Sequence, residues 1–213
     1  MPFCLPAEAQ SAAQLVGYLA DPHRYVLAYQ QLIGLGAEAS GAARDGLRHQ
    51  DPRVRMHCCR VLDHVMDPDS IPALTAALWD PDEEVRVQAL HALACDRCKD
   101  GSCRPAAGAV LPTALTMLRR DSSARVRAMA VELVGAWGHS HQEAAAALQE
   151  AASGDPSPAV RKKAGWYAPG GDRPSPARSP ACAAAPAQTL SRSIPHGGIA
   201  RDGPVPWRPA VRR

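Results

Sequence analysis

The chain has 213 residues, of which 46% are apolar, so it is long enough to bury one sizeable core. Aromatic residues make up only 4%, so Leu, Val and Ala must fill that core. The formal charge of +3 is small, and no apolar run approaches the ~20 residues of a membrane span. The first ten residues lack the charged and apolar regions of a signal peptide. We therefore predict a cytoplasmic protein without a membrane segment.

A Val-Arg pair recurs along the chain and marks a repeat. The pairs are Val54-Arg55, Val85-Arg86, Val126-Arg127 and Val160-Arg161, and the arginines are 31, 41 and 34 residues apart. Each pair follows an acidic turn, such as Asp80-Pro81 or Asp155-Pro156, and a weaker copy begins at Asp21-Pro22. A fixed period in this range is typical of a solenoid, in which stacked repeats supply one another's core.

Taken in order, the copies predict five helix pairs, at residues 9–35, 38–66, 70–94, 106–138 and 140–167. The Asp of each turn is expected to cap the second helix of its pair, with Pro in the first helical turn. Apolar residues then recur at helical spacing, as at Val85, Ala89 and Leu93. The predicted fold is an all-α right-handed solenoid over residues 1–171, with an insert at 95–105.

This pattern resembles HEAT repeats, in the short form named after the phycobilisome lyases. The resemblance rests on Asp-Pro followed by Val-Arg and by Ala and Leu at helical offsets, and it covers roughly residues 9–168. It implies an interaction scaffold whose concave face is lined by the second helices. It also implies that Arg55, Arg86, Arg127 and Arg161 pair with Asp between turns rather than form a basic surface for phosphate.

Three cysteines, Cys95, Cys98 and Cys103, interrupt the repeat between two helices. A C-x-x-C turn with further ligands from elsewhere is typical of structural zinc sites. The polar insert has little apolar content of its own, and a metal would order it. We therefore predict a zinc site, with a redox or disulfide role and no special role as the alternatives; disulfides are rare in the cytosol.

The fourth zinc ligand is left open. His91 precedes Cys95 by four residues, so both lie on one face of a helix. His64 is the alternative, because it occupies in the second repeat the position that Cys95 occupies in the third. Cys59 is a weaker candidate, and Cys58 is predicted to be a buried small residue.

The predicted concave face carries two rows of residues, three and six positions after each Val. They are His57, Gln88, Met129 and Lys163, and Arg60, His91, Glu132 and Trp166. These positions lie off the predicted buried stripe and are mostly polar, with Met129 and Trp166 as possible anchors for a partner. We predict that this face binds another protein; ordinary solvated residues would give the same pattern.

Residues 172–213 have a different composition, with eight of the 20 prolines, seven arginines and two aspartates. No helical or strand period is present, which predicts a disordered tail. The tail carries a formal +5 and the rest of the chain −2. Nucleic-acid binding by the solenoid is therefore not expected, and association through the tail is a third hypothesis.

No catalytic constellation is recognisable. The chain has no His-Glu dipeptide of the kind that holds iron in the HEAT-like deoxyhypusine hydroxylases, and no phosphate loop or nucleophile elbow. The phycobilisome lyases attach bilins, but the resemblance gives no residue match for that role. We predict a non-catalytic scaffold for protein–protein interaction with a structural zinc site, and a thiol- or metal-dependent sensor as the alternative.

Overall fold

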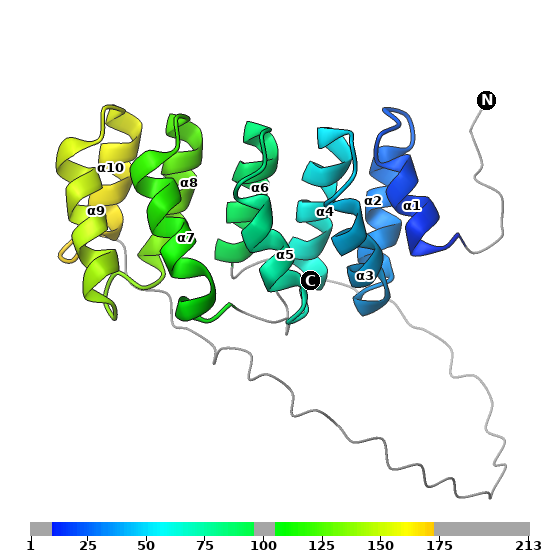
Figure 1. Ribbon diagram of the computed structural model, residues 1–213, viewed down its shortest axis with the longest axis horizontal. Helices are drawn as coiled ribbons and strands as arrows, with labels where there is room; N and C mark the ends of the chain where they lie inside the picture. Colours follow the sequence, from blue (N-terminus) through cyan, green and yellow to red (C-terminus); the bar gives the residue numbers. More distant parts are fainter. Residues whose placement is uncertain (1–9, 96–104, 173–213) are drawn as a thin grey trace, which may run out of the picture. The chain divides into compact units, whose positions relative to one another are not determined.

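The computed structural model of the protein describes residues 10–95 and 105–172. Within these ranges the chain forms ten α-helices and no strand (Figure 1). The helices are α1 Ala12–Tyr18, α2 Tyr25–Gly34, α3 Ala37–Gly46, α4 Pro52–Val65, α5 Ser70–Ala77, α6 Glu83–Ala94, α7 Ala107–Arg120, α8 Ala124–Gly135, α9 Gln142–Gly154 and α10 Pro158–Tyr167.

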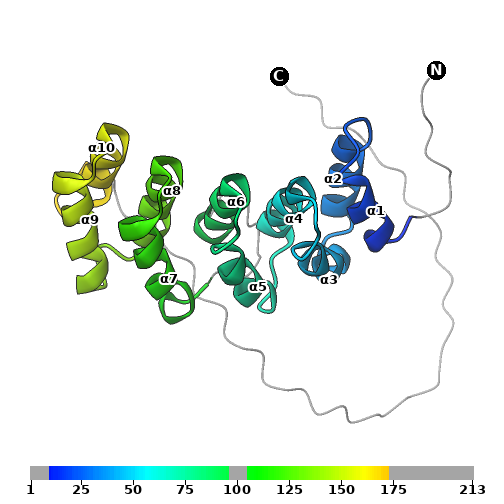
Figure 2. The same cartoon turned by 45° about the horizontal axis from the view of Figure 1, so that its top comes forward.

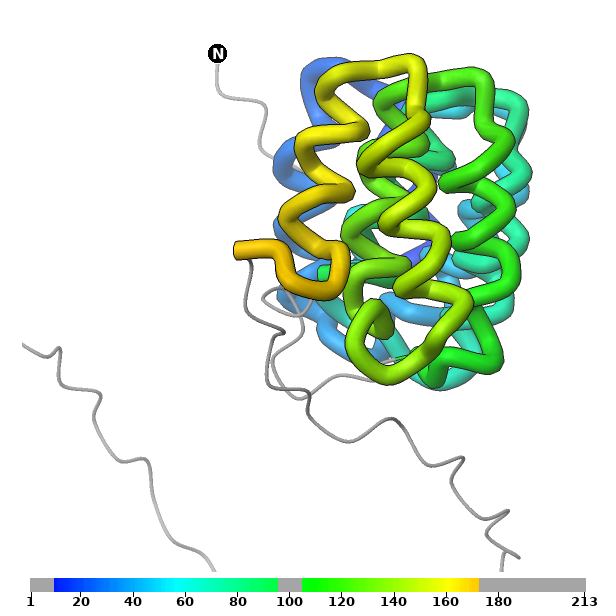
Figure 3. The backbone as a smooth tube through the Cα atoms, turned by 90° about the vertical axis from the view of Figure 1, so that its left-hand side faces the viewer, coloured from blue at the N-terminus to red at the C-terminus, as the bar shows by residue number. Residues whose placement is uncertain are grey.

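The helices form five pairs, which we number as repeats one to five from α1–α2 to α9–α10. Figure 2 shows the two rows: α1, α3, α5, α7 and α9 in one, and α2, α4, α6, α8 and α10 in the other. Along the second row, α4 packs on α6 and α6 on α8, and α8 packs on α10. Seen along the rows in Figure 3, successive pairs lie one behind another. The all-α solenoid of five helix pairs is thus confirmed.

The core runs between the rows and follows the predicted stripe. Val54, Val85, Val126 and Val160, one from each of repeats two to five, are all fully buried. Cys58, one turn after Val54, is also fully buried, as predicted, in the position where the third and fourth repeats carry Ala89 and Ala130. Leu, Val and Ala make up most of this core, as the composition predicts. A core packed in this way tolerates changes in side-chain volume poorly.

The start of most second helices differs from the prediction. Asp51 does cap α4, by accepting the N–H of Arg53 at 2.9 Å, and Pro52 follows in the first turn. In repeats three, four and five, however, the cap residues are Asp82, Ser123 and Ser157. The reason is the spacing between the aspartate and the valine of each repeat. Asp51 is three residues before its Val, whereas Asp80, Asp121 and Asp155 are five residues before theirs.

These three aspartates instead link one repeat to the next. Each accepts two hydrogen bonds from the Val-Arg arginine of the preceding repeat. The pairs are Arg55–Asp80, Arg86–Asp121 and Arg127–Asp155, with Nε···Oδ2 distances of 2.7, 2.8 and 2.8 Å. Each aspartate also accepts the N–H two residues further on, at 2.8–2.9 Å. The Asp–Arg pairing implied by the resemblance is confirmed for these three arginines, which we call the Asp–Arg ladder.

The ladder arginines also hold their own turns. Arg127 Nη1 donates to the carbonyl oxygens of Asp121 and Ser122, and the other arginines make the equivalent pair of bonds. Arg161 makes them as well, to Asp155 and Pro156, but it pairs with no carboxylate within the described part of the chain. The ladder therefore ends at the fifth repeat of the described chain.

Gly46 lies at a close approach of α3 to α4 and α1. A Cβ at Gly46 would lie 2.4 Å from Cys58 Sγ on α4 and 2.9 Å from Val16 Cγ1 on α1. We expect Gly46→Ala to lower the free energy of unfolding by about 1–3 kcal/mol, because overpacking outweighs the better helix propensity of Ala. Gly41→Ala in the same helix is the control: its Cβ meets only Arg44 Nη2 at 3.9 Å, so urea unfolding should show unchanged or higher stability. Equal effects of the two substitutions would contradict this account.

Among the helices that the structure describes, none combines the length and the apolar character that crossing a membrane requires.

Candidate functional site

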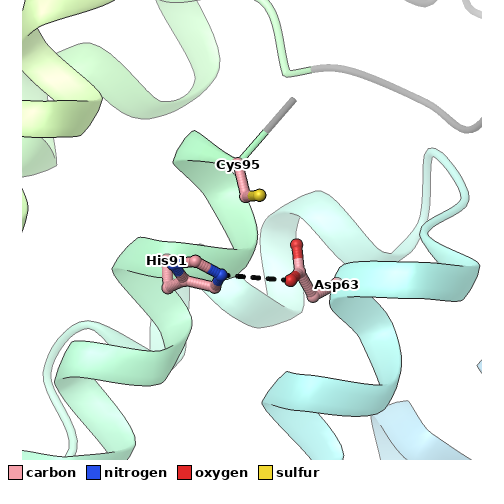
Figure 4. A group of neighbouring side chains, drawn as sticks. All are labelled: Asp63, His91 and Cys95. Carbon is pink, nitrogen blue, oxygen red and sulfur yellow. Dashed lines mark ion pairs between the residues drawn. The ribbon is translucent and has the colours of Figure 1, made fainter. Parts of the chain in front are cut away.

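One group of potential metal ligands occurs among the described residues: Asp63, His91 and Cys95 (Figure 4). A carboxylate oxygen, an imidazole nitrogen and the thiol sulfur all lie within 4.8 Å of one another. His91 Nε2 is 3.3 Å from Asp63 Oδ2. The Asp63 side chain is 5% exposed and the His91 side chain 38%, so the group lies at the edge of the core with one side open.

The two helices α4 and α6 position these side chains. His91 lies in the last turn of α6, and Cys95 is the residue directly after the helix. The N–H of Cys95 donates to the carbonyl of His91 at 2.8 Å, which fixes the cysteine at the end of α6. Asp63 comes from α4, against which α6 packs. As predicted, the sequence places His91 and Cys95 on one face; the contribution of Asp63 was missed.

His64, the predicted alternative ligand, faces the other way. Its ring lies edge-on to Tyr29 of α2, with centroids 6.3 Å apart, so it contacts the preceding repeat. Consecutive residues of an α-helix are rotated by about 100°. For this reason Asp63 faces α6, whereas His64 faces α2. His64 is not part of the ligand group that the described residues form.

The other cysteines of the zinc prediction separate into two sets. Cys98 and Cys103 lie outside the described residues, so their part in a zinc site stays a prediction. Cys58 and Cys59 are fully buried, and burial raises the pKa of both thiols, that of Cys58 to about 12. A thiol is a good metal ligand only as thiolate. Cys59 is not part of the ligand group that the described residues form.

A groove of about 350 Å³ crosses the surface of the second helices. It spans the third, fourth and fifth repeats, and its lining residues are Val87, Gln88 and His91 of α6, Arg125, Ala128 and Met129 of α8, and Lys163 of α10. Four of these seven were predicted from the two rows of the concave face: Gln88, His91, Met129 and Lys163. Val87, Arg125 and Ala128 were not, since the row rule samples only two positions in each repeat.

The charged groups of the groove have partners. Arg125 donates to both carboxylate oxygens of Glu84 one repeat earlier. Lys163 Nζ lies 2.5 Å from Glu132 Oε1, which joins α10 to α8. Glu132, predicted as a partner-binding residue, thus forms an ion pair with Lys163 within the chain. The groove presents paired charges around the apolar surface of Met129 and Ala128.

The remaining residues of the predicted rows lie elsewhere on the second helices. The Arg60 guanidinium covers the Tyr29 ring at 4.7 Å from its centroid. Trp166 is 43% exposed, and Lys162 Nζ lies 5.4 Å from the centroid of its ring. Arg60 is half-buried and Trp166 is exposed, and a role in partner binding stays a prediction for both.

His57 differs from the expectation that these rows lie off the buried stripe. It is 7% exposed, its ring lies 4.9 Å from that of Tyr25, and its Nδ1 is buried with no hydrogen-bond partner among the described residues. Burial, together with the nearby Arg60 and Arg53, lowers its pKa below the usual 6.5. Tyr25 and Tyr29 of α2, in the first repeat, lie against this part of α4 and cover His57. A direct contact between His57 and a partner is therefore not expected.

Comparisons with known structures agree with this architecture. The chain is similar to the complex of CpcE and CpcF of phycocyanin lyase from Nostoc sp., with a TM-score of 0.59 and 19% identity over 72% of this chain and 95% of that one. It is also similar to a designed armadillo repeat protein in complex with the peptide (KR)4, with a TM-score of 0.51 and 19% identity over 74% and 80% of the two chains. At these identities the similarity shows the fold. Among curated proteins, none matches the sequence.

The family model of HEAT repeats matches residues 9–94 and 111–177. The two matched blocks leave out the segment with Cys95, Cys98 and Cys103, as expected for an insertion between the third and fourth repeats. Together they contain the four Val-Arg pairs and all three links of the Asp–Arg ladder. The chain therefore belongs to the HEAT repeat family.

Proposed function

We propose that the protein is a non-catalytic scaffold that binds a segment of another protein along the surface of its second helices. The observation that carries this proposal is the groove across three successive repeats, with Met129 in its lining and paired charges on its sides. Grooves of this kind, with an apolar anchor and a polar rim, suit an extended or helical peptide.

Two features of the similar structures support the same reading. The CpcE–CpcF structure is a complex of two subunits, and the designed armadillo protein is in complex with a peptide. Both therefore use stacked helical repeats in an assembly with another chain or peptide. The Asp–Arg ladder adds a physical reason, since repeats fixed to one another by buried pairs hold the groove residues of α6, α8 and α10 in a constant register.

Peptide display against the full chain tests the proposal. The affinity of the best peptide is then compared between the wild type and Met129→Glu, which places a charge in the apolar part of the groove. We expect Met129→Glu to weaken binding by about tenfold or more, as for a central contact residue. Gln149→Glu is the matched control, because Gln149 is exposed on α9 in the other row. No selected peptide, or equal affinities of the two variants, would refute the proposal.

A metal-dependent role is a second candidate, because Asp63, His91 and Cys95 come together and His91 also lines the groove. In this form of the hypothesis, loss of the metal would loosen the contact between α4 and α6 and so change the groove. Zinc bound by Cys95, Cys98 and Cys103 with His91 is the sequence-based version of this site. Nucleic-acid association through residues 172–213 stays a prediction, to be tested by its dependence on salt.

A further inference from the structure

The ligand group at the end of α6 draws its residues from two different repeats. Asp63 belongs to α4, His91 belongs to α6, and Cys95 directly follows α6, so an ion bound by all three would link the second repeat to the third (Figure 4). An inter-repeat link of this kind differs from a site formed within the cysteine insert alone. The difference can be tested, because only the first kind depends on Asp63.

The separation of the donor atoms fits a tetrahedral ion. Zinc lies about 2.0–2.2 Å from nitrogen and oxygen ligands, which sets two such ligands about 3.4 Å apart at a tetrahedral angle. His91 Nε2 and Asp63 Oδ2 are 3.3 Å apart. A sulfur ligand at about 2.3 Å from zinc would lie about 3.6 Å from the other two atoms. Here all three atoms already lie within 4.8 Å of one another, so the Cys95 sulfur has to come closer by at most about 1.2 Å to reach these distances.

The charges also fit a divalent cation. A neutral imidazole, one carboxylate and one thiolate together carry two negative charges, which a divalent ion neutralises. A thiolate combined with an imidazole favours zinc over magnesium or calcium, which prefer oxygen ligands.

A cysteine nucleophile activated by His91 would need a different arrangement. In such a triad the imidazole stands between the thiol and the carboxylate, with one ring nitrogen toward each. Here the thiol sulfur lies within 4.8 Å of the carboxylate oxygen as well as of the imidazole nitrogen. Three donor atoms that converge on one point are typical of an ion site. We propose that Asp63, His91 and Cys95 bind a zinc ion that links repeats two and three.

The first test uses cobalt as a spectroscopic substitute for zinc in the full chain. We expect one cobalt ion per chain, with a thiolate-to-cobalt absorption band that Cys95→Ser removes. Asp63→Asn should weaken zinc binding, measured by competition with a chelator, by at least about tenfold, the loss caused even by substitutions outside the ligand shell. His64→Gln is the matched control and should bind as the wild type does. Binding that Asp63→Asn leaves unchanged, or a band that survives Cys95→Ser, would overturn the proposal.

A second test needs no substitution and so remains decisive if Asp63→Asn does not fold. Hydrogen exchange of the wild-type chain is measured with and without zinc. An ion shared between the two helices should slow exchange at the end of α4, around residues 61–65, as well as at the end of α6. Zinc that protects α6 and leaves α4 unchanged would overturn the link between the repeats. This result is independent of whether a peptide binds in the groove.

Discussion

Replacing Arg127 by Met should lower the free energy of unfolding by about 3–5 kcal/mol, the cost of removing one partner from a buried ion pair. The side chains of Arg127 and Asp155 are 10% and 6% exposed. Met keeps the aliphatic packing of the arginine but leaves the Asp155 carboxylate buried without the two hydrogen bonds that Arg127 donates. The carbonyls of Asp121 and Ser122 lose a donor as well.

Arg125→Met is the matched control for this prediction. Arg125 lies two residues earlier on α8 and also pairs with a carboxylate, Glu84, but the two side chains are 59% and 37% exposed. Its loss should cost no more than about 1 kcal/mol. Urea unfolding measures the loss of stability in each variant, provided that the dependence of the free energy of unfolding on urea concentration is the same as in the wild type. A loss for Arg127→Met no greater than that for Arg125→Met would show that the ladder does not hold the repeats together.

The double variant Arg127→Met/Asp155→Asn shows how much of the lost stability is due to the unpaired charge of the Asp155 carboxylate. The amide oxygen that Asp155→Asn introduces would still accept the N–H of Ser157, as the Asp155 carboxylate does at 2.8 Å, but it would bury no charge. We expect the double variant to be more stable than Arg127→Met alone, because a neutral amide costs less to bury than an unpaired carboxylate.

The repeat architecture could be predicted from the sequence because its signal is redundant. Val54, Val85, Val126 and Val160 mark the same buried position four times, and each is followed by an arginine that holds its own turn. A helix whose own sequence is ambiguous can then be located from the equivalent positions in the other repeats. The predicted cap was right for Asp51 on α4 and wrong for α6, α8 and α10. In those three repeats the aspartate lies five residues before its Val instead of three, which places it in the turn and not at the start of the helix.

Asp63 could not be identified as a site residue by comparing equivalent positions. The comparison paired Cys95 with His64, but stacked helices bring together residues on facing sides, and His64 faces Tyr29 of the preceding repeat. One signal was present: nine residues after its Val, Asp63 stands where the third and fourth repeats have Ala94 and Gly135. A carboxylate in a position occupied by small residues elsewhere indicates a local function, although the partner helix is known only from the fold.

Acidification should destabilise the protein below about pH 4, and Asp67 should account for a measurable part of this. Asp67 follows α4 and accepts hydrogen bonds from Ser40 and Arg44 of α3 and from Ser70 at the start of α5. Its burial opposes ionisation, but these bonds outweigh that effect and lower its pKa to about 2 from 3.8. Bonds from Arg127 and Arg55 likewise lower the pKa values of Asp155 and Asp80, against the effect of burial.

The direction of the effect follows from these shifts. A carboxyl group whose pKa is lower in the folded than in the unfolded chain stabilises the fold fully above the unfolded value, and this contribution is lost as the pH falls through the folded value. For Asp67 the window therefore runs from about pH 4 down to about pH 2. The shift corresponds to about 2 kcal/mol at neutral pH.

Asp67→Asn isolates this contribution. At pH 7 the variant should be less stable than the wild type by about 2 kcal/mol, and the difference should shrink toward zero as the pH falls from 4 to 2, because protonation removes the same charge from the wild type. Because His57 is present in both proteins, its effect on stability cancels when the two are compared at the same pH. Asp69→Asn is the control, since Asp69 is exposed and caps no N–H of α5. A stability difference for Asp67→Asn that does not change with pH would mean that its hydrogen bonds matter but its charge does not.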